Sequence, residues 1–110
     1  YLTAGSGMPI GVDQNFEYAE LCIKLKPGDR MYLYSDGLTE ARNGQQEQFG
    51  PERLMSCLSK TPNMPLADGA YHTIGQVEKW CSPSEPDDDM TLLVCEMVEG
   101  CAGKTLEECL

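Results

Sequence analysis

Two short apolar segments, far apart in the sequence, each carry acidic residues at one end. Met31–Tyr34 is apolar on both faces and leads into Asp36, whereas Met90–Val98 is rich in aliphatic residues and follows three aspartates at 87–89. This composition predicts inner strands that are covered on both faces. If the strands pair antiparallel, the end of the first lies beside the start of the second, and the acidic residues meet at one rim of a sheet.

The segment before the first apolar run has the pattern of a further strand. Apolar and polar side chains alternate over residues 18–25, which is the period of a half-buried strand. A turn is expected at 26–29, where Pro27 presets φ at the first turn position and Gly28 accepts the positive φ of the second. We therefore expect an antiparallel hairpin over residues 18–36.

Two helices are expected between the apolar runs. Pro51 stands at a helix start and apolar residues follow at helical spacing, so we expect a helix over residues 51–60. Asn63 is expected to cap a second helix, in which apolar residues recur every three or four positions as far as Cys81. The predicted fold class is α+β, with antiparallel sheets flanked by helices.

Size and charge exclude several classes of protein. The chain has 110 residues, enough for at most one ordinary domain, and 8 basic against 18 acidic residues give a net charge of −10. Its basic residues are scattered singly, which argues against binding of nucleic acid. No apolar run is long enough to cross a membrane and no targeting signal is evident, so no membrane contact is expected from this segment.

The cysteines indicate the redox environment of the chain, and its first residues indicate that it is part of a longer polypeptide. Six cysteines lie partly in apolar periodic segments and there is a single histidine, which favours free thiols in a reducing cytoplasm over disulfides or a zinc site. The chain begins without Met in a loop-like stretch, so we expect it to be a piece of a longer polypeptide. Segments upstream could tether the parent protein to a membrane.

The acidic residues at the strand ends have two interpretations. Asp36, Asp88 and Asp89 would form a carboxylate cluster suited to Mg²⁺, Mn²⁺ or Ca²⁺, and Gly37 would leave room for an ion and its waters. Alternatively, Asp-Gly after a strand is a common turn, and a run of aspartates before a strand is commonly a solvated loop or a cap. The two acidic segments together favour the metal-binding interpretation more than either does alone, because both are expected at the same rim of the sheet.

Four ordered motifs resemble those of one enzyme family. Residues 26–43 are similar to the Pro-Gly-Asp…Tyr-Thr/Ser-Asp-Gly-Leu-Thr-Glu-Ala segment of the SpoIIE-like (RsbU-like) branch of the PPM/PP2C metal-dependent serine/threonine phosphatases. Residues 8–12 resemble the family's Pro-Leu-Gly-Val motif, residues 49–54 its Phe-Gly-x-Glu-Arg-Leu helix start, and residues 87–94 its Asp-Asp-Met-Thr-Leu-Leu-Val strand. The resemblance covers about residues 7–98.

This resemblance implies a fold and a metal centre. The fold would be part of an α-β-β-α sandwich, with a binuclear Mn²⁺ or Mg²⁺ centre at one rim. Asp36 is similar to the family's metal-ligating aspartate, and Asp88 is similar to the aspartate that joins it on the same ion. Asp89 would be a weaker ligand and Asp87 weaker still, with the backbone of Gly37 adjacent. No catalytic residues are implied beyond the metal ligands.

Three residues after the metal motif are expected near the substrate. Thr39, Glu40 and Arg42 could shape the segment that faces it. The resemblance implies phosphoserine/phosphothreonine protein phosphatase activity in bacterial signalling, in which a metal-activated water attacks phosphorus and no phosphoenzyme forms. An anti-sigma-factor antagonist is a plausible substrate, which would place the protein in sigma-factor regulation.

The chain departs from the family in length. The family's domain is much longer, and its upstream half carries further metal-binding aspartates that have no counterpart in residues 1–17. We therefore expect residues 1–98 to be the C-terminal half of the domain, residues 99–110 to be a tail, and the fragment to be inactive alone. The alternative is a non-catalytic phosphatase-like interaction module, or a half-domain that forms a homodimer to cover its open sheet.

Overall fold

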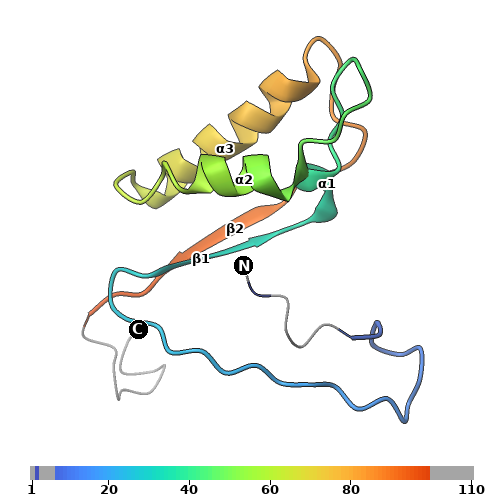
Figure 1. Cartoon of the computed structure of the whole chain (residues 1–110). Coiled ribbons are helices and arrows are strands. Elements are labelled where there is room, and N and C mark those ends of the chain that lie inside the picture. Colours follow the sequence, from blue (N-terminus) through green and yellow to red (C-terminus); the bar gives the residue numbers. More distant parts are fainter. Residues whose placement is uncertain (1, 3–6, 100–110) are drawn as a thin grey trace.

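The chain forms a small sheet beneath a layer of helices (Figure 1). The computed structural model describes residue 2 and residues 7–99. This arrangement confirms the predicted α+β class. In chain order the elements are β1 (Arg30–Tyr34), α1 (Asp36–Thr39), α2 (Gly50–Leu58), α3 (Leu66–Cys81) and β2 (Leu92–Glu96).

The two strands pair antiparallel, which is the arrangement under which the acidic residues are expected to meet at one rim. Tyr34 lies opposite Leu92 and Arg30 opposite Glu96, so the end of β1 meets the start of β2. Backbone hydrogen bonds continue the pairing past the strands, with Gly28 N donating to Met97 O at 2.8 Å. The described residues hold one two-stranded sheet and one helical layer, which is part of the sandwich implied by the resemblance.

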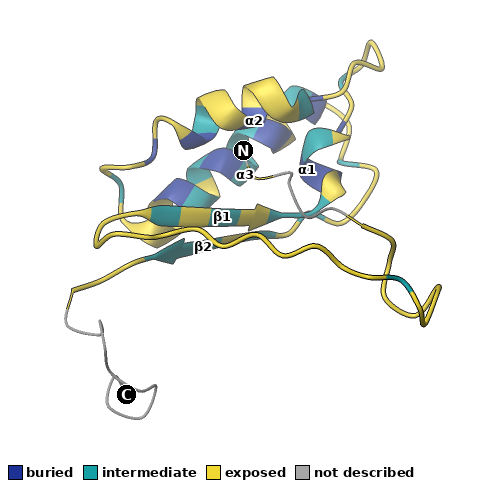
Figure 2. Ribbon diagram, turned by 60° about the horizontal axis from the view of Figure 1, so that its bottom comes forward, coloured by how far each residue is buried: buried dark blue, intermediate teal, exposed yellow. Residues whose placement is uncertain are grey.

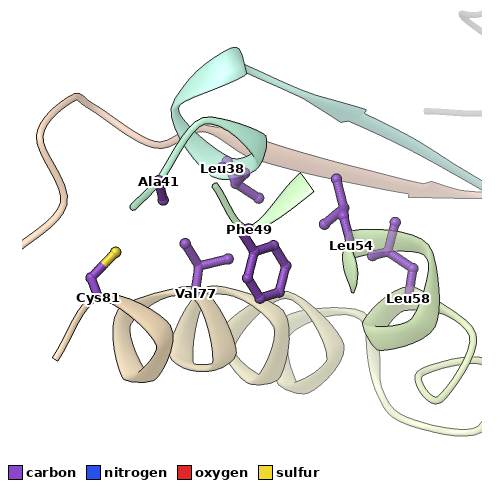
Figure 3. Close-up of a cluster of buried hydrophobic side chains, with 7 residues drawn as sticks. All are labelled: Leu38, Ala41, Phe49, Leu54, Leu58, Val77 and Cys81. Carbon is purple, nitrogen blue, oxygen red and sulfur yellow. The ribbon is translucent and has the colours of Figure 1, made fainter. Parts of the chain in front are cut away.

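The core lies between the helices and one face of the sheet. Seven apolar side chains are buried there (Figure 3). Tyr32, Tyr34 and Leu92 pack against this cluster from the inner face of the sheet. The helices thus supply one complete side of a core. The seven buried residues are Leu38, Ala41, Phe49, Leu54, Leu58, Val77 and Cys81.

The opposite face of the sheet is open (Figure 2). Met31 is 36%, Leu33 is 47% and Leu93 is 55% exposed. The prediction that both strands are covered on both faces is therefore wrong for the described chain. An apolar pattern shows that a face favours burial, but the described residues supply helices to one side only.

The predicted hairpin over residues 18–36 is also wrong. Its turn forms, because Asp29 N donates to Lys26 O at 3.0 Å and Gly28 has φ +90°. However, residues 18–25 form no strand, and in the described chain no backbone hydrogen bond joins them to β1. The alternating pattern favours one buried face, whereas a strand also needs a partner for its backbone. β1 finds that partner in β2.

The two longer helices match their predicted positions with small differences at the ends. The first spans Gly50–Leu58 rather than 51–60. Asn63 does not cap the second, because Met64 N donates to Thr61 O in a turn that precedes Pro65, the residue at the N-cap position. The expected tail at 99–110 lies outside the described residues, except for Glu99.

A polar network anchors the loop between α2 and α3 to the sheet. The Arg30 guanidinium donates to Glu96 Oε1 at 3.0 Å, to Thr61 O at 2.8 Å and to Met64 O at 2.6 Å. Its hydrogen bond with Glu96 raises the pKa of Arg30 above its already high ordinary value. Thr61 is fully buried, donates to Leu58 O and is hydrogen-bonded to the Tyr32 hydroxyl. The network lies at the end of the sheet away from the aspartates.

Candidate functional site

Ser35 joins the two acidic segments at the rim of the sheet. It follows β1 directly, and its backbone N–H donates to Thr91 O at 3.0 Å. Its hydroxyl accepts from Thr91 N at 3.0 Å and donates to Asp89 O at 3.4 Å. The end of β1 and the approach to β2 therefore meet, as their antiparallel pairing predicts. No motif in the sequence singles out Ser35 as a functional residue, although its position between a strand and Asp-Gly could have indicated it.

Gly37 allows a close approach of these segments. It is buried, and a Cβ atom there would overlap the carbonyl oxygen of Asp89. The residue is expected to leave room for an ion and its waters, but the space beside its Cα is taken by this carbonyl. Glycine at 37 thus fits the backbone of one acidic segment against the other.

The predicted ligands lie on exposed parts of this rim. Asp36 is the first residue of α1, and Asp88 and Asp89 lie in the segment that leads to β2. All three are exposed, and Asp88 Oδ1 accepts from Asp89 N at 2.8 Å. A cavity of about 220 Å³ at the rim is lined in part by Gly37 and Asp88. Asp36 does not line this cavity.

The donor chemistry fits part of a site for a hard cation. Carboxylate oxygens suit Mg²⁺ and Mn²⁺, and exposed carboxylates can bind an ion that keeps several waters. Within the described residues, however, no group of three or more His, Cys, Asp or Glu side chains lies close enough together to hold a metal. The described residues thus hold no complete set of ligands for a metal ion.

The residues expected near the substrate divide into two kinds. Thr39 is half-buried and donates to Asp36 O at 3.3 Å, so its hydroxyl is engaged within α1. Glu40 and Arg42 are exposed and line the same cavity as Asp87 and Asp88. Arg42 is held by an antiparallel bridge to Gln48. The rim therefore combines carboxylates with one guanidinium.

No helix in the described ranges is long and apolar enough to cross a membrane.

Comparison with known proteins places these observations in a family. Residues 1–98 match the family described as Stage II sporulation protein E (SpoIIE). The chain is 26% identical over 96 residues to the phosphoserine phosphatase RsbU of Bacillus subtilis, a match that covers 86% of this chain and 28% of RsbU. It is 35% identical over 54 residues to the protein IcfG of Synechocystis sp., covering 49% of this chain and 8% of IcfG.

A solved structure agrees with the sequence matches. The SiaA-PP2C domain of Pseudomonas aeruginosa superimposes with a TM-score of 0.66 and 25% identity, covering 76% of this chain and 34% of that domain's chain. The chain therefore spans about a third or less of the length of these relatives. Because the family match extends over nearly all of the described residues, the chain belongs to the SpoIIE family of PP2C-type phosphatases and corresponds to part of their domain.

Proposed function

We propose that residues 1–98 are the C-terminal half of a metal-dependent protein serine/threonine phosphatase domain, followed by a tail at 99–110. The observation that carries the proposal is the hydrogen bonding of Ser35 to Asp89 and Thr91, which brings the two acidic segments to one rim. The family match supports the reaction class.

Asp36 and Asp88 are the proposed ligands of Mn²⁺ or Mg²⁺, in a centre that is binuclear in the complete domain. Asp89 and Asp87 are weaker candidates, as the family resemblance implies. Bound cations of this kind lower the pKa of water and neutralise charge on phosphoryl oxygens. A chain with a net charge of −10 repels a phosphate unless cations reverse the local field.

Arg42 is the described residue best suited to contact the phosphate itself. It lines the cavity that Asp88 also lines, and its exposed guanidinium can donate two parallel hydrogen bonds to phosphate oxygens. Glu40 lies beside it and would help to orient the substrate or its waters, whereas Thr39 would support the turn that carries Asp36.

The remaining metal ligands are proposed to come from a segment outside this chain. Two carboxylates are too few to complete the centre, and the described residues hold no larger group. The isolated fragment is accordingly inactive, and the complete domain is active. Mn²⁺-dependent hydrolysis of a phosphoserine peptide by the isolated 110 residues would contradict this part of the proposal.

The proposed substrate is a phosphoserine or phosphothreonine protein in bacterial signalling. RsbU, one of the relatives, is a phosphoserine phosphatase, which supports this class. An anti-sigma-factor antagonist, sigma-factor regulation and a cytoplasmic location follow as the finer form of the proposal.

Titration of Mn²⁺ into the complete domain tests the ligand assignment. Asp36→Asn removes a carboxylate with little change in shape, so we expect Mn²⁺ affinity to fall by about tenfold or more and phosphopeptide hydrolysis to fall with it. Asp68→Asn, an exposed carboxylate on α3, is the matched control and should change neither. Unchanged Mn²⁺ affinity in Asp36→Asn would remove Asp36 from the site.

The exposed face of the sheet, which carries Met31, Leu33 and Leu93 and which we call the bare face, favours a second candidate function. A phosphatase-like module without activity could pair with a second copy through this exposed apolar face. Sedimentation of the complete domain, together with the Mn²⁺ titration, separates the two. A stable dimer that binds no Mn²⁺ supports the module, and a Mn²⁺-binding active domain supports the phosphatase.

A further inference from the structure

A groove runs along one side of α3. It has a volume of about 870 Å³ and lies between α3 and residues 84–92. The helix contributes residues at positions 67, 70, 71, 74 and 78, which fall on one face because they recur every three or four residues. The groove is open to solvent rather than enclosed. We call it the α3 groove.

The α3 groove has an apolar floor. Ile74, Met90 and Leu92 line it and are half-buried, while Ala67 and Ala70 leave space through their small side chains. Tyr71 lines the groove and is 78% exposed, so its ring is free to cover a bound group. Exposed aromatic and aliphatic surface in a groove is typical of sites that bind another chain.

The rim of the α3 groove is acidic. Glu78, Glu85, Asp88 and Asp89 line it and are all exposed, and no Lys, Arg or His lines it. The one ion pair among the described residues is Arg30–Glu96, so these four carboxylates have no basic partner there. Glu78 and Glu85 keep their charge even when a cation is bound by Asp88 and Asp89, and this charge favours a ligand with Lys or Arg beside apolar residues.

We propose that the α3 groove binds the segment of the phosphoprotein substrate that flanks the phosphorylated residue, and that this segment is apolar and basic. The proposal rests on the proposed phosphatase function. Asp88 lines both the groove and the cavity at the rim, so a substrate whose phosphate lies at that rim continues into the groove. Acidic flanking residues would be repelled by Glu78 and Glu85, which lie outside the proposed metal site.

Paired phosphopeptides test this specificity in the complete domain with Mn²⁺. One phosphoserine peptide carries Leu, Lys and Arg beside the phosphoserine, and the other carries Glu in place of Lys and Arg. We expect the KM of the basic peptide to be lower by about tenfold, with a difference that shrinks at high salt. Equal KM values for the two peptides would overturn the proposal.

Charge reversal in the α3 groove provides the matched test. The double variant Glu78→Lys/Glu85→Lys should raise the KM of the basic peptide and lower that of the acidic one, which reverses the preference. The double variant Glu20→Lys/Glu52→Lys makes the same change in net charge at exposed positions outside the groove, and the preference should remain. If both double variants shift the preference equally, the preference depends only on the net charge of the domain and the groove has no role.

Failure of this proposal is distinguishable from failure of the proposed function. Hydrolysis of para-nitrophenyl phosphate reports the phosphatase alone, because this small substrate has no flanking residues. Fluorescence anisotropy of the labelled basic peptide without phosphate reports the α3 groove alone. Binding of this peptide that is lost in Glu78→Lys/Glu85→Lys supports the groove whether or not hydrolysis occurs, and absence of binding contradicts it.

Discussion

The two faces of the sheet carry similar residues but have different surroundings. On the inner face, Tyr32 lies opposite Val94 and packs against the helices. On the outer face, Leu33 lies opposite Leu93 and Met31 opposite Cys95, yet Leu33 and Leu93 are exposed. Apolar residues at paired positions on both faces mean that the strands are suited to lie between two layers. The described chain supplies one layer, and we expect the other to come from the rest of the sandwich.

The largest effect is expected for truncation on the covered side. Leu54 is fully buried between the helices and the sheet, so Leu54→Ala should lower the free energy of unfolding by about 2–5 kcal/mol through lost burial and a cavity. Leu33→Ala on the bare face of the isolated chain should change it by less than about 0.5 kcal/mol. Urea denaturation followed by circular dichroism measures both.

The same pair of variants sharpens the comparison in the complete domain. If a second layer covers the bare face there, Leu33→Ala should cost about as much as Leu54→Ala. A small effect of Leu33→Ala in both settings would show that this face stays open.

The next largest effect on stability is expected at Gly37, where the backbone of Asp89 leaves no space for a side chain. Gly37→Ala places a Cβ against the Asp89 carbonyl, so we expect a loss of about 1–3 kcal/mol in stability and weaker Mn²⁺ binding in the complete domain. Gly44→Ala is the control, because no atom lies within 4 Å of a Cβ at that position. Equal effects of the two changes would show that the close approach is unimportant.

A smaller effect is expected for the polar network on the covered side. Thr61→Val keeps the shape of a fully buried side chain but removes its hydrogen bonds to Leu58 O and the Tyr32 hydroxyl, at a cost of about 1–2 kcal/mol. A double-mutant cycle with Tyr32→Phe isolates the bond between the two side chains. Additive effects in that cycle would argue against a coupled network.

The smallest effect concerns the reactivity of cysteines on the two faces. Burial, with a smaller effect of the charge of Asp87, raises the pKa of the Cys81 thiol above its ordinary value of 9.0. Cys95 lies opposite Met31 on the bare face and is half-buried. Iodoacetamide reacts with the thiolate, so mass spectrometry should find Cys95 modified before Cys81 near pH 8. Faster modification of Cys81 would contradict its burial.

The same pKa shift predicts how stability depends on pH. Because the pKa of Cys81 is higher in the folded than in the unfolded chain, its neutral thiol stabilises the fold fully below the unfolded value near 9.0. This contribution falls as the pH rises through the folded pKa. The urea midpoint should therefore decrease above about pH 9. The control is Cys81→Ala, which is less stable at every pH but should lose less of its stability above pH 9.

Local patterns allowed the elements and the rim to be predicted. The turn at 26–29 and the two longer helices depend on turn residues and helical spacing, and the meeting of the acidic segments depends on the geometry of antiparallel strands once the two apolar runs pair. The proximity of the segments that carry Asp36 and Asp88 follows from that pairing alone. These features are set by nearby residues or by one pair of strands.

Features that depend on distant surroundings were not predictable in the same way. The alternation at 18–25 indicates a face suited to burial, but it does not specify a partner strand, and the described segment has none. The contact between Gly37 and the Asp89 carbonyl, and the role of Ser35 in joining the acidic segments, appear only when two distant parts of the backbone are placed together.

The pairing of β1 with β2 also sets an order of events in synthesis. β1 is made before α2 and α3, whereas its partner β2 follows them, so the chain must close a long loop before the sheet can form. Until Leu92–Glu96 emerges from the ribosome, β1 has no partner and Asp36 is separated from Asp88. A nascent chain that stops before this strand therefore has the helices but neither the sheet nor the rim, so the proposed metal site can assemble only after β2 has been synthesised.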